Sequence, residues 1–173
     1  MIIVLIGYMA SGKSTIGRIL ANKLNFDFVD LDDYIEAVEK RSIKNIFTTS
    51  GEIYFRKKET LCLIEILSKR NNIVLSLGGG TPCYGNNMEI ILQNENVASI
   101  YLKATIESLV KRLENENDKR PLVSRFKTKN ELIEFIGKHL FERLQFYSQS
   151  NFTVITDNKS QSEIIEDIIF NLF

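Results

Sequence analysis

The sequence has 173 residues, of which 44% are hydrophobic and 25% charged, and its 22 basic residues balance its 22 acidic ones. A chain of this length suits one domain with its own core, and a neutral balance produces no overall field that attracts nucleic acid or a membrane surface. Two cysteines, Cys62 and Cys83, form no disulfide framework, and no Cys/His cluster has zinc spacing. No run approaches the roughly 18 apolar residues of a membrane span. We therefore expect a single domain over residues 1–173, monomeric and cytoplasmic, with no nucleic-acid or membrane partner.

Short apolar runs alternate with longer amphipathic stretches, which is typical of βαβ units and a mainly parallel sheet. The expected strands are Ile2–Ile6, Phe26–Val29, Ile73–Leu77, Val97–Leu102 and Phe152–Ile155. Their nearly continuous apolar character favours strands buried on both faces. The expected helices are Lys13–Lys23, Glu52–Leu67, Ile106–Leu113, Glu131–Tyr147 and Gln161–Asn171, with Thr105 and Ser162 as N-caps. The sequence therefore predicts an α/β fold.

One stretch has a different character. Residues Glu114–Lys129 are polar, charged and interrupted by Pro121. A long polar loop inside a compact domain is usually functional, so we predict a lid over about residues 114–127.

The first apolar run leads into Gly7–Ser14, which fits the pattern G-x-x-x-x-G-K-[ST] at every fixed position. Gly7 and Gly12 allow backbone angles that turn N–H groups around a phosphate, and Lys13 adds a positive charge. The hydroxyl of Ser14 can ligate Mg²⁺, and the helix that follows directs its positive dipole end at the same anion. The ATP-binding residues expected here are Ala10, Ser11, Gly12, Lys13, Ser14 and Thr15. The motif by itself predicts only a nucleotide phosphate, because motors and switches use it as well.

The second expected strand ends in Asp30, Asp32 and Asp33. Ligands of open α/β sheets bind at the carboxyl ends of strands, so these carboxylates would lie beside the phosphate loop. One could hold the hydration shell of Mg²⁺ and the other could accept a proton from an attacking hydroxyl. The alternative is a helix N-cap with dipole-favoured acids, and Asp33 fits that role well.

Further along the chain, glycines and arginines indicate an anionic acceptor. Gly78–Gly80 end the third expected strand and would expose bare backbone N–H groups to a ligand, although a tight turn is the alternative. Arg56 precedes Glu59 by one helical turn, a pair that is often only solvated surface. Arg143 lies among aromatic residues and suits bidentate carboxylate binding. Arg120, on the polar loop, could neutralise transition-state charge.

Taken together, these segments resemble the shikimate kinase family of P-loop metabolite kinases over essentially the whole chain. The matching segments are the phosphate loop Gly7–Ser14, D-x-D at Asp30 and Asp32, F-R-x-x-E at Phe55–Glu59, G-G-G at Gly78–Gly80, R-P-L at Arg120–Leu122 and E-R-x-x-x-Y at Glu142–Tyr147. The phosphate loop is generic, but the ordered set of the other five is specific. Thr81–Tyr84, directly after the glycines, match no part of that pattern.

The resemblance implies a three-layer P-loop kinase fold with a five-stranded parallel sheet in the order 2-3-1-4-5, a substrate-binding subdomain at about residues 33–61, and a lid. It implies transfer of the γ-phosphoryl group of MgATP to the 3-hydroxyl of shikimate, giving shikimate 3-phosphate and ADP. The rival hypotheses are a gluconate-type sugar-acid kinase and a catalytically silent nucleotide-binding module.

The residue roles that the resemblance implies fall into four groups. Lys13, Asp32 and Arg120 would be catalytic. Arg112 and Arg120 would bind ATP together with the phosphate loop, and residues 157–160 would border the base. Shikimate would be bound by Asp32, Arg56, Gly78, Gly79, Gly80 and Arg143. Ser14 would ligate Mg²⁺, with Asp30 in its outer shell.

Overall fold

The computed structural model describes residues 1–114, 126 and 128–173. Five strands form one parallel sheet in the order β2-β3-β1-β4-β5. They are β1 (Ile2–Ile6), β2 (Asp27–Asp30), β3 (Ile73–Ser76), β4 (Val97–Lys103) and β5 (Phe152–Ile155). The predicted fold class and strand order are therefore confirmed. The bounds of β1 and β5 are as expected, and those of the other strands differ by one residue.

Helices follow each strand in turn. They are α1 (Lys13–Leu24), α2 (Leu31–Glu39), α3 (Ile43–Lys69), the short 3-10 helix η1 (Thr81–Cys83), α4 (Asn87–Gln93), α5 (Ile106–Glu114), α6 (Lys129–Tyr147) and α7 (Gln161–Leu172). Neither α2 nor α4 was predicted. Both helices are short. In addition, α2 begins within the acidic run Asp30–Asp33, which the sequence analysis interpreted mainly as a ligand site.

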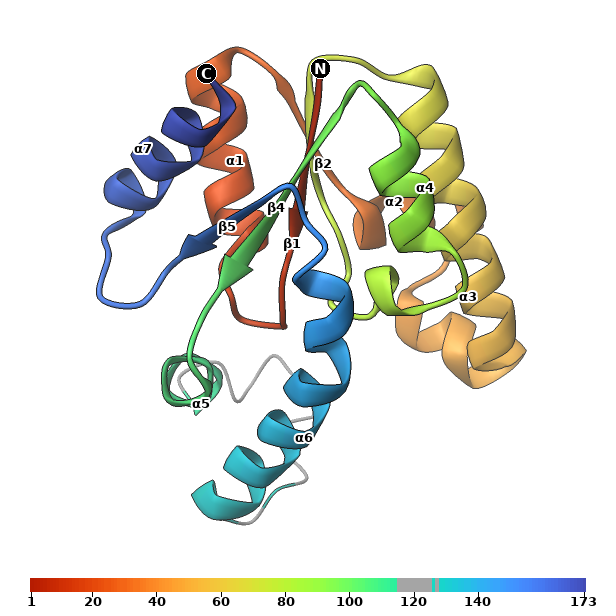
Figure 1. Cartoon of the computed structure of the whole chain (residues 1–173). Coiled ribbons are helices and arrows are strands. Elements are labelled where there is room, and N and C mark those ends of the chain that lie inside the picture. The colour runs from red at the N-terminus through yellow and green to blue at the C-terminus, as the bar shows by residue number, and fades with distance from the viewer. Residues whose placement is uncertain (115–125, 127) are drawn as a thin grey trace.

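The central strand separates two hydrophobic cores. Ile2, Val4 and Ile6 face the core that includes buried residues of α3, α4 and α6, whereas Ile3 and Leu5 face the core of α1 and α7. All five side chains are fully buried, as expected of a strand with helices on both faces. Figure 1 shows α1 and α7 on one side of the sheet and α2, α3 and α4 on the other. The three-layer arrangement thus follows from the period-two alternation of an entirely apolar strand.

Because the strands are parallel, their carboxyl ends gather at one edge of the sheet, toward α5 and α6 in Figure 1. The turns from β1 to α1, from β2 to α2 and from β3 to η1 all lie at this edge. Segments up to about 70 residues apart in sequence are thereby brought together, which is where ligands of open α/β sheets bind.

The long helix α3 is bent at Gly51. That residue has φ 80° and ψ 171°, which departs from helical geometry and falls in the left-handed half of φ space that favours glycine. The predicted helix Glu52–Leu67 begins directly after this bend, so its start was placed correctly. The preceding stretch from Ile43, capped by the Ser42 side chain, was missed.

The expected subdivision of the chain is only partly visible. The predicted substrate-binding subdomain, about residues 33–61, covers most of α2 and the first part of α3, and it stays a prediction, as does the single domain. Most of the predicted lid lies outside the described residues, because only Glu114 and Phe126 of it belong to them. Among the helices that the structure describes, none is both long and apolar enough to cross a membrane.

Two predicted N-caps had different outcomes. The hydroxyl of Thr105 accepts a hydrogen bond from the backbone N–H of Ser108, at 3.3 Å, so this cap is confirmed. Ser162 was the wrong residue for α7. Ser160 caps that helix in a reciprocal box with Glu163, each side chain accepting from the other's backbone N–H. The capping box gives an acceptor to the backbone N–H groups of Ser160 and Glu163. A cap at Ser162 would leave both without this acceptor.

Replacing the cap of α7 tests this correction. Ser160→Ala should lower the free energy of unfolding by about 1 kcal/mol, because the N–H of Glu163 loses its acceptor. Ser162→Ala, an exposed position in the same turn, is the matched control and should change it by less than about 0.5 kcal/mol. Urea unfolding measures both, and a larger loss at Ser162 would contradict the assignment.

Candidate active site

The phosphate loop connects β1 to α1 and has the backbone its sequence predicts. Gly12 has φ 98° and Ala10 φ 61°, both in the left-handed region. Gly7 is needed because of a close approach: a Cβ there would lie 2.7 Å from Ser11 Oγ and 2.9 Å from the carbonyl oxygen of Leu102. The loop is therefore folded tightly against the end of β4.

Two polar side chains of this loop are buried. Lys13 is 8% exposed, and its ammonium donates to the carbonyl oxygens of Gly7 at 2.9 Å and Tyr8 at 3.0 Å. Ser11 is 2% exposed, and its Oγ has no hydrogen-bond partner among the described residues. A buried hydroxyl without a partner is costly, so this one is well suited to an oxygen-rich ligand.

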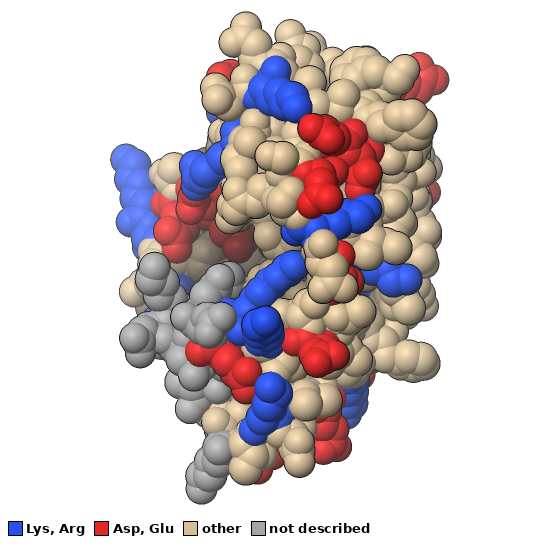
Figure 2. Space-filling view, turned by 90° about the vertical axis from the view of Figure 1, so that its left-hand side faces the viewer, with Lys and Arg blue, Asp and Glu red and all other residues tan. Residues whose placement is uncertain are grey.

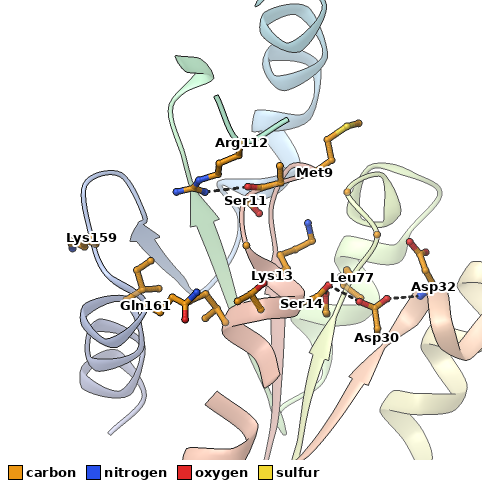
Figure 3. Close-up of a pocket in the computed structure, with 18 residues that line it drawn as sticks. Met9, Ser11, Lys13, Ser14, Asp30, Asp32, Leu77, Arg112, Lys159 and Gln161 are labelled. Atoms are coloured by element: carbon orange, nitrogen blue, oxygen red, sulfur yellow. Dashed lines mark hydrogen bonds between the residues drawn. The ribbon is translucent and has the colours of Figure 1, made fainter. Parts of the chain in front are cut away.

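The acidic residues after β2 contact the loop directly. Ser14 Oγ donates to Asp30 Oδ2 at 2.8 Å, and Asp30 Oδ1 accepts from the backbone N–H of Asp32 at 3.1 Å (Figure 3). Asp30 is thus the N-cap of α2 and at the same time the partner of Ser14. The two hypotheses for this acidic run, helix cap and phosphate-site ligand, therefore apply to the same residue. The N-cap role expected of Asp33 was wrong, because Asp33 lies in the first turn of α2, after the cap. Its exposed side chain forms an ion pair with Arg18 at 3.9 Å.

Asp32 has an unusual electrostatic environment. Burial raises the pKa of its carboxyl to about 6, and the negative charges of Asp30 and Glu59 add to the rise, while Lys13 and Arg56 oppose it. A carboxyl with a pKa near the working pH can both accept and release a proton, which suits general base catalysis.

Gly78–Gly80 bring three charged side chains together at the end of β3. A Cβ on the first of these glycines would lie 3.2 Å from Asp32 Oδ1, on the second 3.5 Å from a terminal nitrogen of Arg143, and on the third 3.0 Å from a terminal nitrogen of Arg56. A side chain on Gly78 or Gly80 would crowd Asp32 or Arg56, whereas one on Gly79 would make only an ordinary van der Waals contact with Arg143. The glycines therefore do more than form a tight turn, because their bare backbone is the surface on which the charged groups pack.

Arg56 is held on several sides. Its NH1 donates to Glu59 Oε2 at 2.8 Å, and Glu59 is only 1% exposed. Its Nε is buried without a hydrogen bond to a described residue, although Glu52 Oε1 lies 3.5 Å away. The pair of Arg56 and Glu59 is therefore not the solvated surface pair that its spacing alone would suggest, and a guanidinium with further donors faces the glycines.

Arg143 reaches the glycines from α6. Its guanidinium carbon lies 5.5 Å from the centroid of the Tyr8 ring in the phosphate loop. One turn further along α6, the hydroxyl of Tyr147 donates to the carbonyl oxygen of Gly79 at 2.5 Å. The last family segment, E-R-x-x-x-Y, thus fixes α6 to the glycine turn through Tyr147 and presents Arg143 beside it.

A cavity of about 450 Å³ opens over the phosphate loop. Its wall includes Ala10, Ser11, Gly12, Lys13, Ser14, Thr15, Asp30, Asp32, Gly78, Gly79 and Arg112. In Figure 3, Asp30 and Asp32 lie on one side of Lys13, and Lys159 and Gln161 lie on the other. Arg112 donates to the carbonyl oxygen of Ala10 at 3.2 Å. The cavity thus extends from the acidic residues across the loop to the start of α7.

Charged residues of both signs border this region. On the face shown in Figure 2 the surface is hollowed, and acidic and basic side chains lie around the hollow. The chain has no net charge, so the electrostatic potential at the cavity depends on individually placed side chains.

Sequence reasoning missed two residues at the acceptor side. Thr81 is fully buried and donates to Glu59 Oε1 at 2.6 Å, and the Tyr84 ring lies 3.8 Å from the guanidinium carbon of Arg56. In the sequence, only their position directly after Gly78–Gly80 pointed to them.

Burial raises the pKa of Cys83, which lies between Thr81 and Tyr84, to about 11, and this makes its thiol unreactive. Arg120 lies outside the described residues.

The comparisons with known proteins agree with this geometry. A family model described as shikimate kinase matches residues 9–172. This chain belongs to the shikimate kinase family. It is therefore an ATP-dependent phosphotransferase, and the membership predicted from the ordered motifs is confirmed.

Individual relatives cover almost the whole length of the chain. The shikimate kinase of Flavobacterium psychrophilum is 46% identical over 171 residues, 99% of this chain and 98% of that protein. That of Flavobacterium johnsoniae is 45% identical and covers 96% of both chains.

Solved structures of the family match as well. Shikimate kinase from Bacteroides thetaiotaomicron superposes with a TM-score of 0.89 at 34% identity, covering 99% of this chain and 98% of that one. Shikimate kinase from Acinetobacter baumannii in complex with shikimate gives 0.85 at 30% identity, covering 99% and 92%. Among the alternatives, the comparisons favour a shikimate kinase over a gluconate-type kinase or a silent nucleotide-binding module.

The environment of Asp32 predicts a pH-dependent stability. The folded carboxyl keeps its proton up to about pH 6, whereas the unfolded one loses it near 3.8. The stability that this proton contributes is present below pH 3.8 and lost as the pH rises through 6. Asparagine is neutral at every pH, like the protonated carboxyl. Asp32→Asn should therefore raise the free energy of unfolding by about 1–3 kcal/mol at pH 8 and leave it nearly unchanged at pH 4.

Urea unfolding at the two pH values measures this difference. Asp33→Asn, one residue along and exposed, is the matched control and should change stability by less than about 0.5 kcal/mol at either pH. An equal gain for Asp32→Asn at both pH values would show that burial does not perturb this carboxyl.

Proposed function

We propose that this member of the shikimate kinase family transfers the γ-phosphoryl group of MgATP to the 3-hydroxyl of shikimate. The acceptor would lie at Gly78–Gly80, between the cavity over the phosphate loop and the Arg56 and Arg143 side chains. The observation that carries the proposal is the convergence of Asp32, Arg56 and Arg143 on Gly78–Gly80, beside the phosphate loop. A cyclic alcohol with a carboxylate would meet a base at one end and two guanidinium groups at the other.

The nucleotide would lie along the cavity over the phosphate loop. Backbone N–H groups of Gly12 to Thr15, the Ser11 hydroxyl and the Lys13 ammonium would surround the phosphates. Arg112, which contacts the Ala10 carbonyl, would border the nucleotide at the far side, with Lys159 and Gln161. The proposal includes Arg120 as a further cation from the lid, on the strength of the R-P-L segment alone.

Ser14 and Asp30 fit a magnesium site of the kind that phosphoryl-transfer enzymes use. Mg²⁺ is usually bound by one or two protein oxygens together with water and substrate phosphates, and Ser14 and Asp30 are already hydrogen-bonded to each other. Ser14 would ligate the ion and Asp30 would hold one of its waters. When bound, the ion neutralises charge on the phosphate oxygens.

In the transfer step, the oxygen of the acceptor hydroxyl would form a bond to the γ-phosphorus while the bond from that phosphorus to the β,γ-bridging oxygen breaks. The hydroxyl proton would pass to the carboxylate of Asp32, and ADP would leave. Lys13 would offset the negative charge at the phosphates, and Arg56 and Arg143 would hold the acceptor's carboxylate so that its hydroxyl is aligned.

A single chain supplies both sides of the cleft, from the phosphate loop to α6. This supports a monomer as the active species. ATP as co-substrate and two free cysteines fit the cytoplasmic location expected from the sequence.

ADP release in the presence of MgATP and a panel of acceptors tests the proposal. ADP should form with shikimate and only at the background rate with gluconate or without an acceptor. ADP release with gluconate but not with shikimate would instead favour the sugar-acid kinase. Omitting Mg²⁺ should abolish turnover with shikimate.

The role of Lys13 leads to a separate prediction. Lys13→Ala should lower kcat at least about 100-fold, because a cation aimed at the developing phosphate charge is lost. Lys23→Ala, at the exposed end of the same helix, is the matched control and should keep full activity. Circular dichroism checks that both variants are folded, and a fully active Lys13→Ala protein would refute the role.

The role of Arg143 is tested by binding. Arg143→Ala should weaken shikimate binding by roughly 2–4 kcal/mol, since a desolvated carboxylate would lose its partner. Arg18→Ala, an exposed arginine, should leave the affinity unchanged. Calorimetric titration measures both, and an unaltered affinity of Arg143→Ala would mean that the acceptor pocket is assigned wrongly.

A further inference from the structure

Tyr84 makes a face-to-cation contact with an arginine of the proposed acceptor site. The guanidinium carbon of Arg56 lies 3.8 Å from the centroid of the Tyr84 ring, well inside the range in which an aromatic face attracts a cation. Nothing in the family pattern includes Tyr84, because it belongs to the unmatched segment that follows the glycines. The contact therefore requires its own explanation.

The ring is itself held in place. The Tyr84 hydroxyl donates to Glu52 Oε1 at 2.8 Å, and the same carboxylate oxygen lies 3.5 Å from Arg56 Nε. Tyr84, Glu52 and Arg56 therefore form a closed set of contacts between the end of η1 and α3. Such a set restricts the ring more than a single surface stack would.

Tyr84 contacts the face of the Arg56 guanidinium, and Glu59 contacts its edge. Glu59 Oε2 accepts from NH1 of Arg56 at 2.8 Å, and Thr81 in turn donates to the other oxygen of Glu59 at 2.6 Å. A hydrogen bond at one edge fixes where a guanidinium lies but leaves the tilt of its plane less restricted. An aromatic ring against its face fixes that tilt, which decides whether a carboxylate can be bound through two parallel hydrogen bonds.

Tyr84 also limits the access of water to Arg56. Both residues line a groove of about 700 Å³ on the outside of α3, together with Ile53, Leu61 and Gly85. The side chain of Arg56 is 20% exposed, while Tyr84 is 38% exposed. Without the ring, the guanidinium would meet solvent in this groove, and its interaction with a bound carboxylate would weaken.

We propose that Tyr84 is a positioning residue that holds the Arg56 guanidinium in the plane needed to bind the acceptor's carboxylate. It acts through Arg56 and has no contact of its own with the reacting atoms. The inference rests on the proposed function, because it takes Arg56 to be a carboxylate ligand.

Two variants separate the ring from its hydroxyl. Tyr84→Leu removes the aromatic face and keeps an apolar side chain, whereas Tyr84→Phe keeps the face and loses the hydrogen bond to Glu52. Tyr84→Leu should raise the KM for shikimate about three- to thirtyfold, with kcat and the KM for ATP within about twofold of the original. Tyr84→Phe should keep the KM for shikimate within about threefold of that of the original protein.

The matched control is another aromatic ring that stacks on an arginine, outside the predicted substrate-binding subdomain. The guanidinium carbon of Arg18 lies 4.5 Å from the centroid of the Phe28 ring, which belongs to β2. Phe28→Leu also removes an aromatic face and should leave the KM for shikimate within about twofold. If Tyr84→Leu fails to fold, as judged by circular dichroism and its thermal midpoint, Tyr84→Met replaces it under the same expectations.

A double-mutant cycle decides whether Tyr84 acts through Arg56. Shikimate affinity is measured by calorimetry for Tyr84→Leu, for Arg56→Met and for the two combined. In the Arg56→Met background, Tyr84→Leu should weaken binding by less than about twofold, because the group it positions is gone. Additive losses, or equal losses in Tyr84→Leu and Tyr84→Phe, would overturn the inference.

The same cycle keeps the inference apart from the proposed function. If Arg56→Met binds shikimate as tightly as the original protein, the acceptor site itself is assigned wrongly. If Arg56→Met binds weakly while Tyr84→Leu binds normally, the acceptor site stands and only the positioning role of Tyr84 is refuted.

Discussion

Close packing of charged side chains against bare backbone is the constraint on which this site depends. At Gly78–Gly80, at the end of β3, the positions that Cβ atoms would occupy lie within 3.5 Å of groups on Asp32, Arg56 and Arg143. These side chains come from α2, α3 and α6, so the turn is where three helices meet the sheet. Tyr147 fixes α6 to this turn through the Gly79 carbonyl. A Cβ on Gly78 or Gly80 would press on the side chain of Asp32 or Arg56, whereas one on Gly79 would meet Arg143 at ordinary van der Waals distance.

The electrostatics of the cleft follow from this crowding. Burial raises the pKa of Asp32 to about 6, and the negative charges of Asp30 and Glu59 add to the rise. Lys13 and Arg56 oppose the rise, so the site holds a carboxylate that is ionised at neutral pH but only moderately stable as an anion. The chain carries no net charge, so the placement of individual side chains decides the potential at the site.

The same residues serve structure and proposed chemistry at once. Asp30 caps α2 and binds Ser14, and Glu59 holds Arg56 while accepting from Thr81. A polar group shared in this way restricts each of its partners, most of all the buried Glu59. In this way a helix cap and an ion pair, which are common surface features elsewhere, become parts of a preorganised cleft.

The sequence by itself determined the sheet, the phosphate loop and the family, because apolar periodicity, Gly7, Gly12 and Lys13, and the order of short motifs are all local patterns. It also identified Arg56 and Arg143 as candidates. Only the tertiary structure decided that Arg56 pairs with the buried Glu59, that Asp30 rather than Asp33 caps α2, and that Tyr84 stacks on Arg56. These facts depend on contacts between residues that are distant along the chain, or on which of several nearby residues accepts a hydrogen bond. Burial and partner choice are properties of packing, and no pattern within one segment records them.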